Sequence, residues 1–212
     1  MRVEVKICGL TRPEDARAAD MAGASLLGVV FAGGPRQVTV AQAHAIRRTS
    51  ILPLVAVVAG RSVPELLRLR DEVEYDIAQL HDGFAERDAE ALAAAGVRVW
   101  QVWRIADEAD LARAARWRAA EAVLVEARVP QGLGGTGQRV PLPLARAARE
   151  RLGDARMVLA GGLAPGTVAE AVTVVRPQVV DVSSGVEERP GVKDHTLIRQ
   201  FVEAARGSHA RP

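Results

Sequence analysis

The residues best suited to acid–base chemistry are Cys8 and Glu126, each of which ends an apolar run. Cys8, the only cysteine in 212 residues, closes the alternating run 3–7, which is typical of a β-strand. Glu126 follows the apolar run 122–125. A thiolate can act as a general base and a carboxylic acid as a general acid when their surroundings move both pKa values toward neutrality. The alternatives are a cysteine that only packs as a small hydrophobe and an exposed loop carboxylate; the apolar run before Glu126 argues against the second.

Two turns rich in glycine and serine indicate a phosphate site. They follow the last two predicted strands and contain Gly161, Gly162, Ser183, Ser184 and Gly185. Glycines let backbone N–H groups approach an anion, hydroxyls add donors, and a short helix from Ser184 would point its positive end at the phosphate. The alternative is that these glycines only make tight turns. Two such turns in succession favour phosphate binding.

Three further polar residues follow predicted strands. Arg36 offers a planar fork that matches a carboxylate, and its alternative is a salt bridge within the loop. His81 could orient or polarise a substrate, or be a structural histidine with satisfied hydrogen bonds. Asp181 follows two valines, and the strand register alone leaves the direction of its side chain open.

Apolar runs and helical segments alternate along the chain. Strands are predicted at 3–7, 26–31, 53–59, 76–80, 97–103, 122–126, 156–160 and 178–182. Helices are predicted at 13–23, after Thr39, from Ser62 to about 72, and at 86–95, 108–120, 142–152, 165–175 and 194–206. A long glycine-rich loop at 127–140 interrupts this rhythm and is typical of a functional loop.

Eight strand–helix pairs with short connections predict an α/β protein with one domain over residues 1–212. The count favours a closed (β/α)8 barrel, or TIM barrel, over a doubly wound sheet. In such a barrel the carboxyl ends of all eight strands share one mouth, where catalytic residues lie. All the residues named above would meet there.

Three helix starts have capping signatures. The segments 39–42 and 62–65 each have Thr or Ser followed three residues later by Gln or Glu, which is the pattern of a capping box. In the first helix we expect Thr11 as N-cap, Pro13 in the first turn and Glu14 closing the box.

Composition limits the function classes. The formal net charge is +2, aromatic residues make up 3%, and the basic residues are spread rather than clustered, which argues against nucleic-acid binding. No apolar run approaches the roughly 20 residues that span a bilayer, and the charge at Glu4 argues against a signal peptide. A single cysteine indicates a reducing cytoplasm, and four scattered histidines give no metal site. Nearly all basic residues are Arg, so Lys6 and Lys193, the only lysines, are notable.

Six segments are similar to those of one enzyme family. They are KICGLT at 6–11, GPRQV at 34–38, QLH at 79–81, GLGGTG at 132–137, LAGGL at 159–163 and VDVSSGVEERPGVKD at 180–194. The last of these is the most specific. On these motifs the chain resembles the phosphoribosylanthranilate isomerases of tryptophan biosynthesis over nearly its whole length.

The resemblance implies a (β/α)8 barrel and a cofactor-free Amadori rearrangement of N-(5-phosphoribosyl)anthranilate, a phosphosugar. It implies Cys8 as the base at the sugar C2 and Glu126 as the acid for the ring oxygen. Arg36 would hold the anthranilate carboxylate, and Asp181 would contact the substrate near the reacting centre. Gly161, Gly162, Ser183 and Ser184 would bind the phosphate. We expect a monomer or a homodimer.

The chain departs from the family at position 126, where the family usually has aspartate and this chain has Glu126. The carboxyl chemistry is kept, but the extra methylene moves the acid. Two alternatives therefore stand beside the isomerase: a relative that rearranges another N-ribosyl arylamine, and a phosphosugar-binding barrel without turnover. Cys8 and a carboxylate at position 126 argue against the second alternative, because binding alone needs neither.

Overall fold

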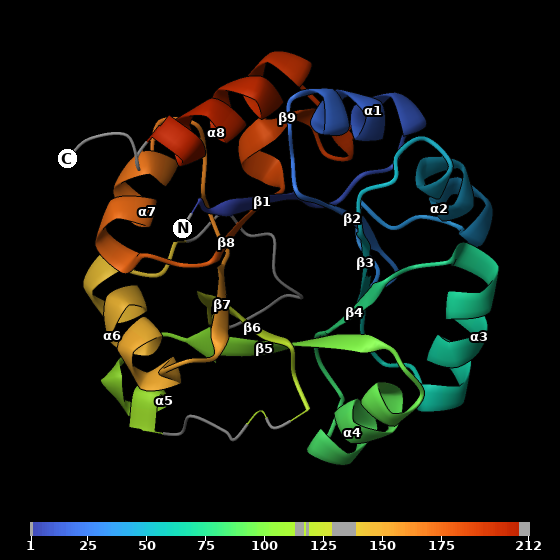
Figure 1. Cartoon of the computed structure of the whole chain (residues 1–212), viewed down its shortest axis with the longest axis horizontal. Helices are drawn as coiled ribbons and strands as arrows, with labels where there is room; N and C mark the ends of the chain where they lie inside the picture. Colours follow the sequence, from blue (N-terminus) through green and yellow to red (C-terminus); the bar gives the residue numbers. More distant parts are fainter. Residues whose placement is uncertain (1, 113–116, 118, 129–138, 208–212) are drawn as a thin grey trace.

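Eight parallel strands form a closed barrel in which each strand pairs with the next along the chain and β8 pairs with β1 (Figure 1). The computed structural model describes residues 2–112, 117, 119–128 and 139–207. The barrel strands are β1 Glu4–Ile7, β2 Leu26–Val30, β3 Leu54–Val58, β4 Ile77–Leu80, β5 Arg98–Ile105, β6 Ala122–Ala127, β7 Arg156–Leu159 and β8 Val179–Val182. The predicted (β/α)8 barrel is confirmed.

Helices surround the barrel, one after each strand (Figure 1). They are α1 Pro13–Met21, α2 Val40–Arg47, α3 Val63–Val73, α4 Glu86–Ala94, α5 Glu108–Ala112, α6 Leu142–Leu152, α7 Val168–Val175 and α8 His195–Gly207. Most of the predicted loop 127–140, and residues 113–116 and 118 of the helix predicted at 108–120, lie outside the described residues. The predicted end of that helix at 120 was wrong, because residues 117, 119 and 120 are not helical. A short 3-10 turn, η1 Ser184–Val186, and a hairpin of β9 Glu187–Arg189 and β10 Val192–Lys193 separate β8 from α8. The turn was predicted; the hairpin was not.

The apolar runs are buried on both faces because the strands pack inward on each other and outward on the helices. A small cluster drawn from β2 to β8 fills the interior, with the fully buried Trp100 as its largest member. Side chains alternate along a strand, so the residues two positions further along point into the mouth. Glu126 follows Leu124 in this way, and Asp181 follows Val179.

In the first helix Pro13 lies in the first turn as predicted, but the predicted cap by Thr11 and Glu14 was wrong. Arg12 is the N-cap of α1 and makes no side-chain cap. The Thr11 hydroxyl instead donates to the Gly191 carbonyl of the hairpin, which could not be foreseen because the hairpin was not. The other two signatures are confirmed. Gln42 closes a box with Thr39, and the Glu65 carboxylate accepts from the Ser62 N–H at 2.8 Å.

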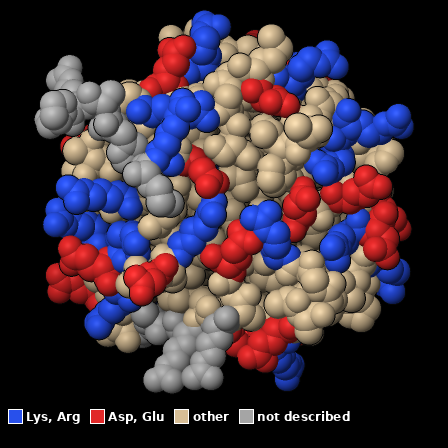
Figure 2. All heavy atoms as spheres, viewed as in Figure 1, with Lys and Arg blue, Asp and Glu red and all other residues tan. Residues whose placement is uncertain are grey.

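The surface carries charges of both signs. Figure 2 shows Lys and Arg interspersed with Asp and Glu over the face seen in Figure 1. Within the described ranges no helix is long and apolar enough to cross a membrane. The same part of the chain contains no group of three or more His, Cys, Asp or Glu side chains placed to hold a metal ion.

Candidate active site

A cavity of about 350 Å³ opens at the carboxyl ends of the strands, a volume suited to a small molecule. Nine of the ten predicted site residues line it: Cys8, Arg36, His81, Glu126, Gly161, Gly162, Asp181, Ser183 and Ser184. The barrel therefore brings together residues that are spread over most of the chain.

Gly185 does not line the cavity. A Cβ at this position would lie 1.9 Å from the Leu163 carbonyl oxygen. The absence of a side chain thus lets η1 pack against the turn that follows β7. The two predicted phosphate turns are neighbours because of this contact.

A fully buried lysine lies beneath the cavity. Lys6 Nζ lies 3.1 Å from Asp181 Oδ1, its register partner on β8, and donates to Gln79 Oε1 at 2.9 Å. Burial alone would lower the pKa of Lys6, but the negative charges of Asp181 and Cys8 raise it above its ordinary value. Lys6 is therefore a permanent cation inside the barrel mouth.

Cys8 is buried two residues beyond Lys6. Burial raises the pKa of its thiol, whereas the positive charges of Lys6 and Lys193 oppose that rise. A Cβ on Gly28 would lie 3.1 Å from Cys8 Sγ and 3.0 Å from Lys6 Cε. Glycine at this position of β2 thus leaves room for the thiol and the lysine side by side.

Glu126 is buried at the opposite wall. Its Oε1 accepts from Arg104 Nε at 2.8 Å, and Arg104 also binds Asp82. Burial raises the pKa of Glu126 above that of an ordinary carboxyl group, while Arg104 opposes the rise. A raised pKa suits a general acid.

Both ring nitrogens of His81 face hydrogen-bond donors. Lys6 has only donors, so the Gln79 oxygen faces it and the Gln79 amide nitrogen faces His81 Nε2, at 2.7 Å. His81 Nε2 must then accept, and Nδ1 faces a second donor, Arg104 Nη2, at 3.2 Å. Burial, with Arg104 and Lys6, lowers the pKa of His81 to about 4, so the ring is neutral at physiological pH. Nδ1 lies 3.8 Å from Glu126 Oε1.

Arg36 lines the cavity, and one edge of its guanidinium already binds a carboxylate of the protein. Its Nε and Nη2 donate to the two oxygens of Glu187 at 2.8 and 2.7 Å. A salt bridge is therefore present, as the alternative supposed, although its partner lies on β9 and not in the loop of Arg36. A guanidinium has five N–H donors, so its other edge remains for a second carboxylate.

Sequence reasoning missed five polar residues around the site: Lys6, Gln79, Arg104, Glu187 and Lys193. The two lysines had a signal, because they are the only ones in an arginine-rich chain. Arg104 was missed because the fifth strand was predicted to end at 103, whereas β5 continues to Ile105.

Comparison with known proteins agrees with this arrangement. The family model described as N-(5'-phosphoribosyl)anthranilate (PRA) isomerase matches residues 5–204. The chain is 39% identical to the N-(5'-phosphoribosyl)anthranilate isomerase of Haloferax volcanii over 208 residues, which cover 95% of this chain and 92% of that protein. It is 40% identical to the enzyme of the same name from Pelobacter propionicus, with 96% of each chain covered.

Solved structures give the same result. The chain is similar to phosphoribosyl anthranilate isomerase from Thermotoga maritima with a TM-score of 0.87 and 32% identity, covering 97% of this chain and 99% of that one. A second structure, with a TM-score of 0.85, 31% identity and the same coverage, is an isomerase in complex with reduced 1-(o-carboxyphenylamino)-1-deoxyribulose 5-phosphate.

Proposed function

The chain belongs to the N-(5'-phosphoribosyl)anthranilate isomerase family, and we propose that Cys8 and Glu126 are the base and the acid of its reaction. It is an aldose–ketose isomerase of tryptophan biosynthesis. Its reaction is the Amadori rearrangement of N-(5-phosphoribosyl)anthranilate to 1-(2-carboxyphenylamino)-1-deoxyribulose 5-phosphate. The observation that supports the assignment is that a buried thiol and a buried carboxyl group face one cavity.

The first step opens the sugar ring. Protonated Glu126 gives its proton to the furanose oxygen as the bond from C1 to that oxygen breaks, and the nitrogen lone pair forms the C=N bond. The neutral His81 ring lies beside the Glu126 carboxylate left by this step, with Nδ1 3.8 Å from Oε1. Arg104 holds the same carboxylate in place.

The second step removes the proton from C2. The Cys8 thiolate takes it, and the electron pair of the C–H bond forms the C1=C2 bond of an enolamine. Lys6 stabilises the thiolate electrostatically from beneath. The Cys8 thiol then gives its proton to C1, the enol oxygen loses its proton to solvent, and solvent reprotonates Glu126, which gives the ketone and restores both side chains. Every proton has a side-chain or solvent partner, so this mechanism needs no cofactor.

The two ends of the substrate carry negative charge. We assign the phosphate to Gly161, Gly162, Ser183 and Ser184, where positive φ angles at both glycines give backbone conformations that other residues rarely adopt. The free edge of Arg36 takes the anthranilate carboxylate. Asp181, paired with Lys6, is assigned to the sugar hydroxyls.

Three wider assignments belong to the proposal. Residues 1–212 act as one catalytic domain. The enzyme works in the cytoplasm, where a lone cysteine stays reduced. It acts as a monomer or a homodimer; the Thermotoga maritima relative is described as dimeric.

The test is a steady-state assay that follows the fluorescence loss of freshly made phosphoribosylanthranilate. Cys8→Ser and Glu126→Gln should each lower kcat by about 10²- to 10⁴-fold. Glu121→Gln is the matched control, because Glu121 precedes the other end of β6 and binds Arg98. Cys8→Ser should still bind the reduced product analogue. Wild-type turnover by Cys8→Ser or Glu126→Gln would remove that residue from its role.

A further inference from the structure

The Glu187 carboxylate sets the direction of the Arg36 guanidinium. It accepts from the side edge of Arg36 in a bidentate fork, and its side chain is only 4% exposed. A fork of this kind fixes both the position and the plane of the group. The remaining edge of Arg36 therefore faces the cavity with little freedom to turn.

This pair alone supplies no net charge. The positive charge of Arg36 and the negative charge of Glu187 cancel, so a second carboxylate would gain little from approaching them. A further cation is needed for the pair to attract an anion.

Lys193 supplies that cation and also reaches the predicted phosphate turn. Its Nζ donates to Glu187 Oε1 at 2.8 Å, to the Ser183 carbonyl at 3.1 Å and to Ser183 Oγ at 3.4 Å. Three acceptors match the three donors of an ammonium group. The side chain is fully buried, so its charge is poorly screened by solvent.

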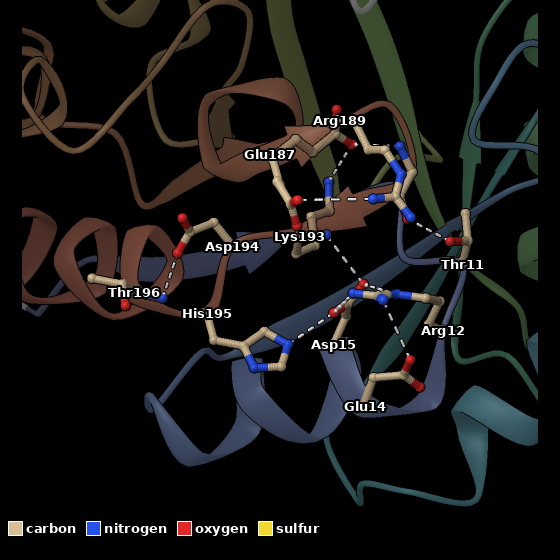
Figure 3. Close-up of polar contacts among 12 residues, drawn as sticks. Thr11, Arg12, Glu14, Asp15, Glu187, Arg189, Lys193, Asp194, His195 and Thr196 are labelled. Carbon is tan, nitrogen blue, oxygen red and sulfur yellow. Dashed lines mark hydrogen bonds and ion pairs between the residues drawn. The ribbon is translucent and has the colours of Figure 1, made fainter.

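The backbone of Lys193 is held from the opposite side (Figure 3). Its N–H donates to Asp15 Oδ2 at 3.2 Å, and the buried Asp15 also binds Arg12 and His195. The lysine is thus fixed at its main chain by Asp15 and at its ammonium group by Glu187 and Ser183. It cannot follow a displaced partner without breaking one of these contacts.

We propose that Lys193 is a positioning residue that sets the charge and the spacing of both anion-binding ends of the site. It orients Arg36 through Glu187 and the phosphate turn through Ser183. The two ends thereby form one unit selective for a phosphosugar that carries a second anionic group at a fixed distance. This inference rests on the proposed roles of Arg36 and Ser183.

The test compares two stable probes on the same protein. One is reduced 1-(o-carboxyphenylamino)-1-deoxyribulose 5-phosphate, and the other is the same molecule without the ring carboxylate. Calorimetry gives Kd for each, and their ratio measures selectivity for the carboxylate. Lys193→Met should reduce this ratio by roughly tenfold or more, as expected for a charge-assisted contact, and should weaken the carboxylate-free probe severalfold.

Arg189→Met is the matched control. It removes a cation from the same hairpin, but Arg189 is exposed and pairs only loosely with Glu188, at 3.8 Å. The ratio of the two Kd values for Arg189→Met should equal that of the wild type. Lys193→Gln provides a second test should Lys193→Met fail to fold: it keeps a hydrogen-bond donor but removes the positive charge, so it should also reduce the ratio.

The outcomes separate this inference from the proposed function. Equal weakening of both probes in Lys193→Met, or an unchanged ratio in the folded variants, overturns the role of Lys193 alone. A wild type that does not distinguish the two probes overturns the assignment of Arg36, and the inference with it.

Discussion

Arg104 and Glu126 are register partners on β5 and β6, and Arg104 Nε donates to Glu126 Oε1 at 2.8 Å. The arginine has a second anchor in Asp82. Glu126, at the position where the resemblance implies aspartate, therefore has a fixed partner on the neighbouring strand. We infer that Arg104 compensates for the extra methylene by holding the longer side chain.

Glu126→Asp should accordingly be slower than the wild type. The shorter carboxylate withdraws from Arg104, and a displacement of about an ångström can cost up to ~10²-fold in rate. Steady-state kcat on phosphoribosylanthranilate measures the effect, with Glu121→Asp as control. An aspartate variant faster than the wild type would show that the glutamate is not adapted to this substrate.

The pH profile should report both buried groups. Burial raises the pKa of Glu126 and of Cys8 above their ordinary values, which lie in the acidic range for a carboxyl group and in the alkaline range for a thiol. The active form of the enzyme has Cys8 as thiolate and Glu126 as carboxylic acid. Between the two pKa values it is a small and constant fraction of the enzyme, because the thiolate fraction rises with pH as fast as the carboxylic acid fraction falls. We expect kcat/KM to be level near neutrality, to fall on the acid side as Glu126 titrates, and to fall on the alkaline side as Cys8 titrates.

Lys6→Met should shift only the alkaline limb of the pH profile of kcat/KM. Loss of the lysine cation raises the pKa of Cys8 further, so the limb shifts to higher pH and the level region drops. Profiles of kcat/KM for the variant and the wild type measure this shift, and melting curves show whether the variant is folded. An alkaline limb that stays in place would mean that Lys6 does not act on the thiol.

Gly28→Ala should impair catalysis more than stability. The new methyl group would lie 3.1 Å from both the sulfur and the Cα of Cys8, so the thiol must shift. We expect kcat to fall by about 10²-fold with a modest loss of Tm. Gly166→Ala is the control, because its Cβ would meet nothing within 4 Å. Full activity of Gly28→Ala would show that the position of Cys8 tolerates such a shift.

Gly185→Ala should separate the two phosphate turns. Its methyl group would overlap the Leu163 carbonyl, a backbone atom that cannot simply rotate away. We expect the free energy of unfolding to fall by about 1–3 kcal/mol, together with weaker binding of inorganic phosphate. Denaturant unfolding and calorimetry measure the two effects. Wild-type values for both would mean that the contact between the turns is easily relaxed.

The barrel could be predicted from sequence because each strand is a short apolar run followed by a helix. The site could be predicted as far as a residue directly follows such a run, as Cys8 and Glu126 do. Residues whose roles depend on a partner from another strand could not be predicted from the sequence. The register that pairs Lys6 with Asp181, or Arg104 with Glu126, is set by barrel closure and leaves no local pattern.

The hairpin shows the same limit. Its strands are three and two residues long, too short for a periodic signal. Yet the hairpin supplies Glu187 and Lys193. Its Gly191 carbonyl also accepts a hydrogen bond from the Thr11 hydroxyl, which was expected to cap the first helix. A local rule failed at Thr11 because a distant segment offered a competing acceptor.

The contacts of Thr11 with Gly191 and of Asp15 with His195 join positions 180 residues apart in the chain. Contacts of such sequence separation form late, because a long loop must close before they stabilise the fold. A nascent chain that has left the ribosome only as far as η1 already contains Cys8, Glu126 and both phosphate turns. It lacks the segment that aligns them, so catalytic competence arises only when the last two elements, β10 and α8, dock onto the first helix.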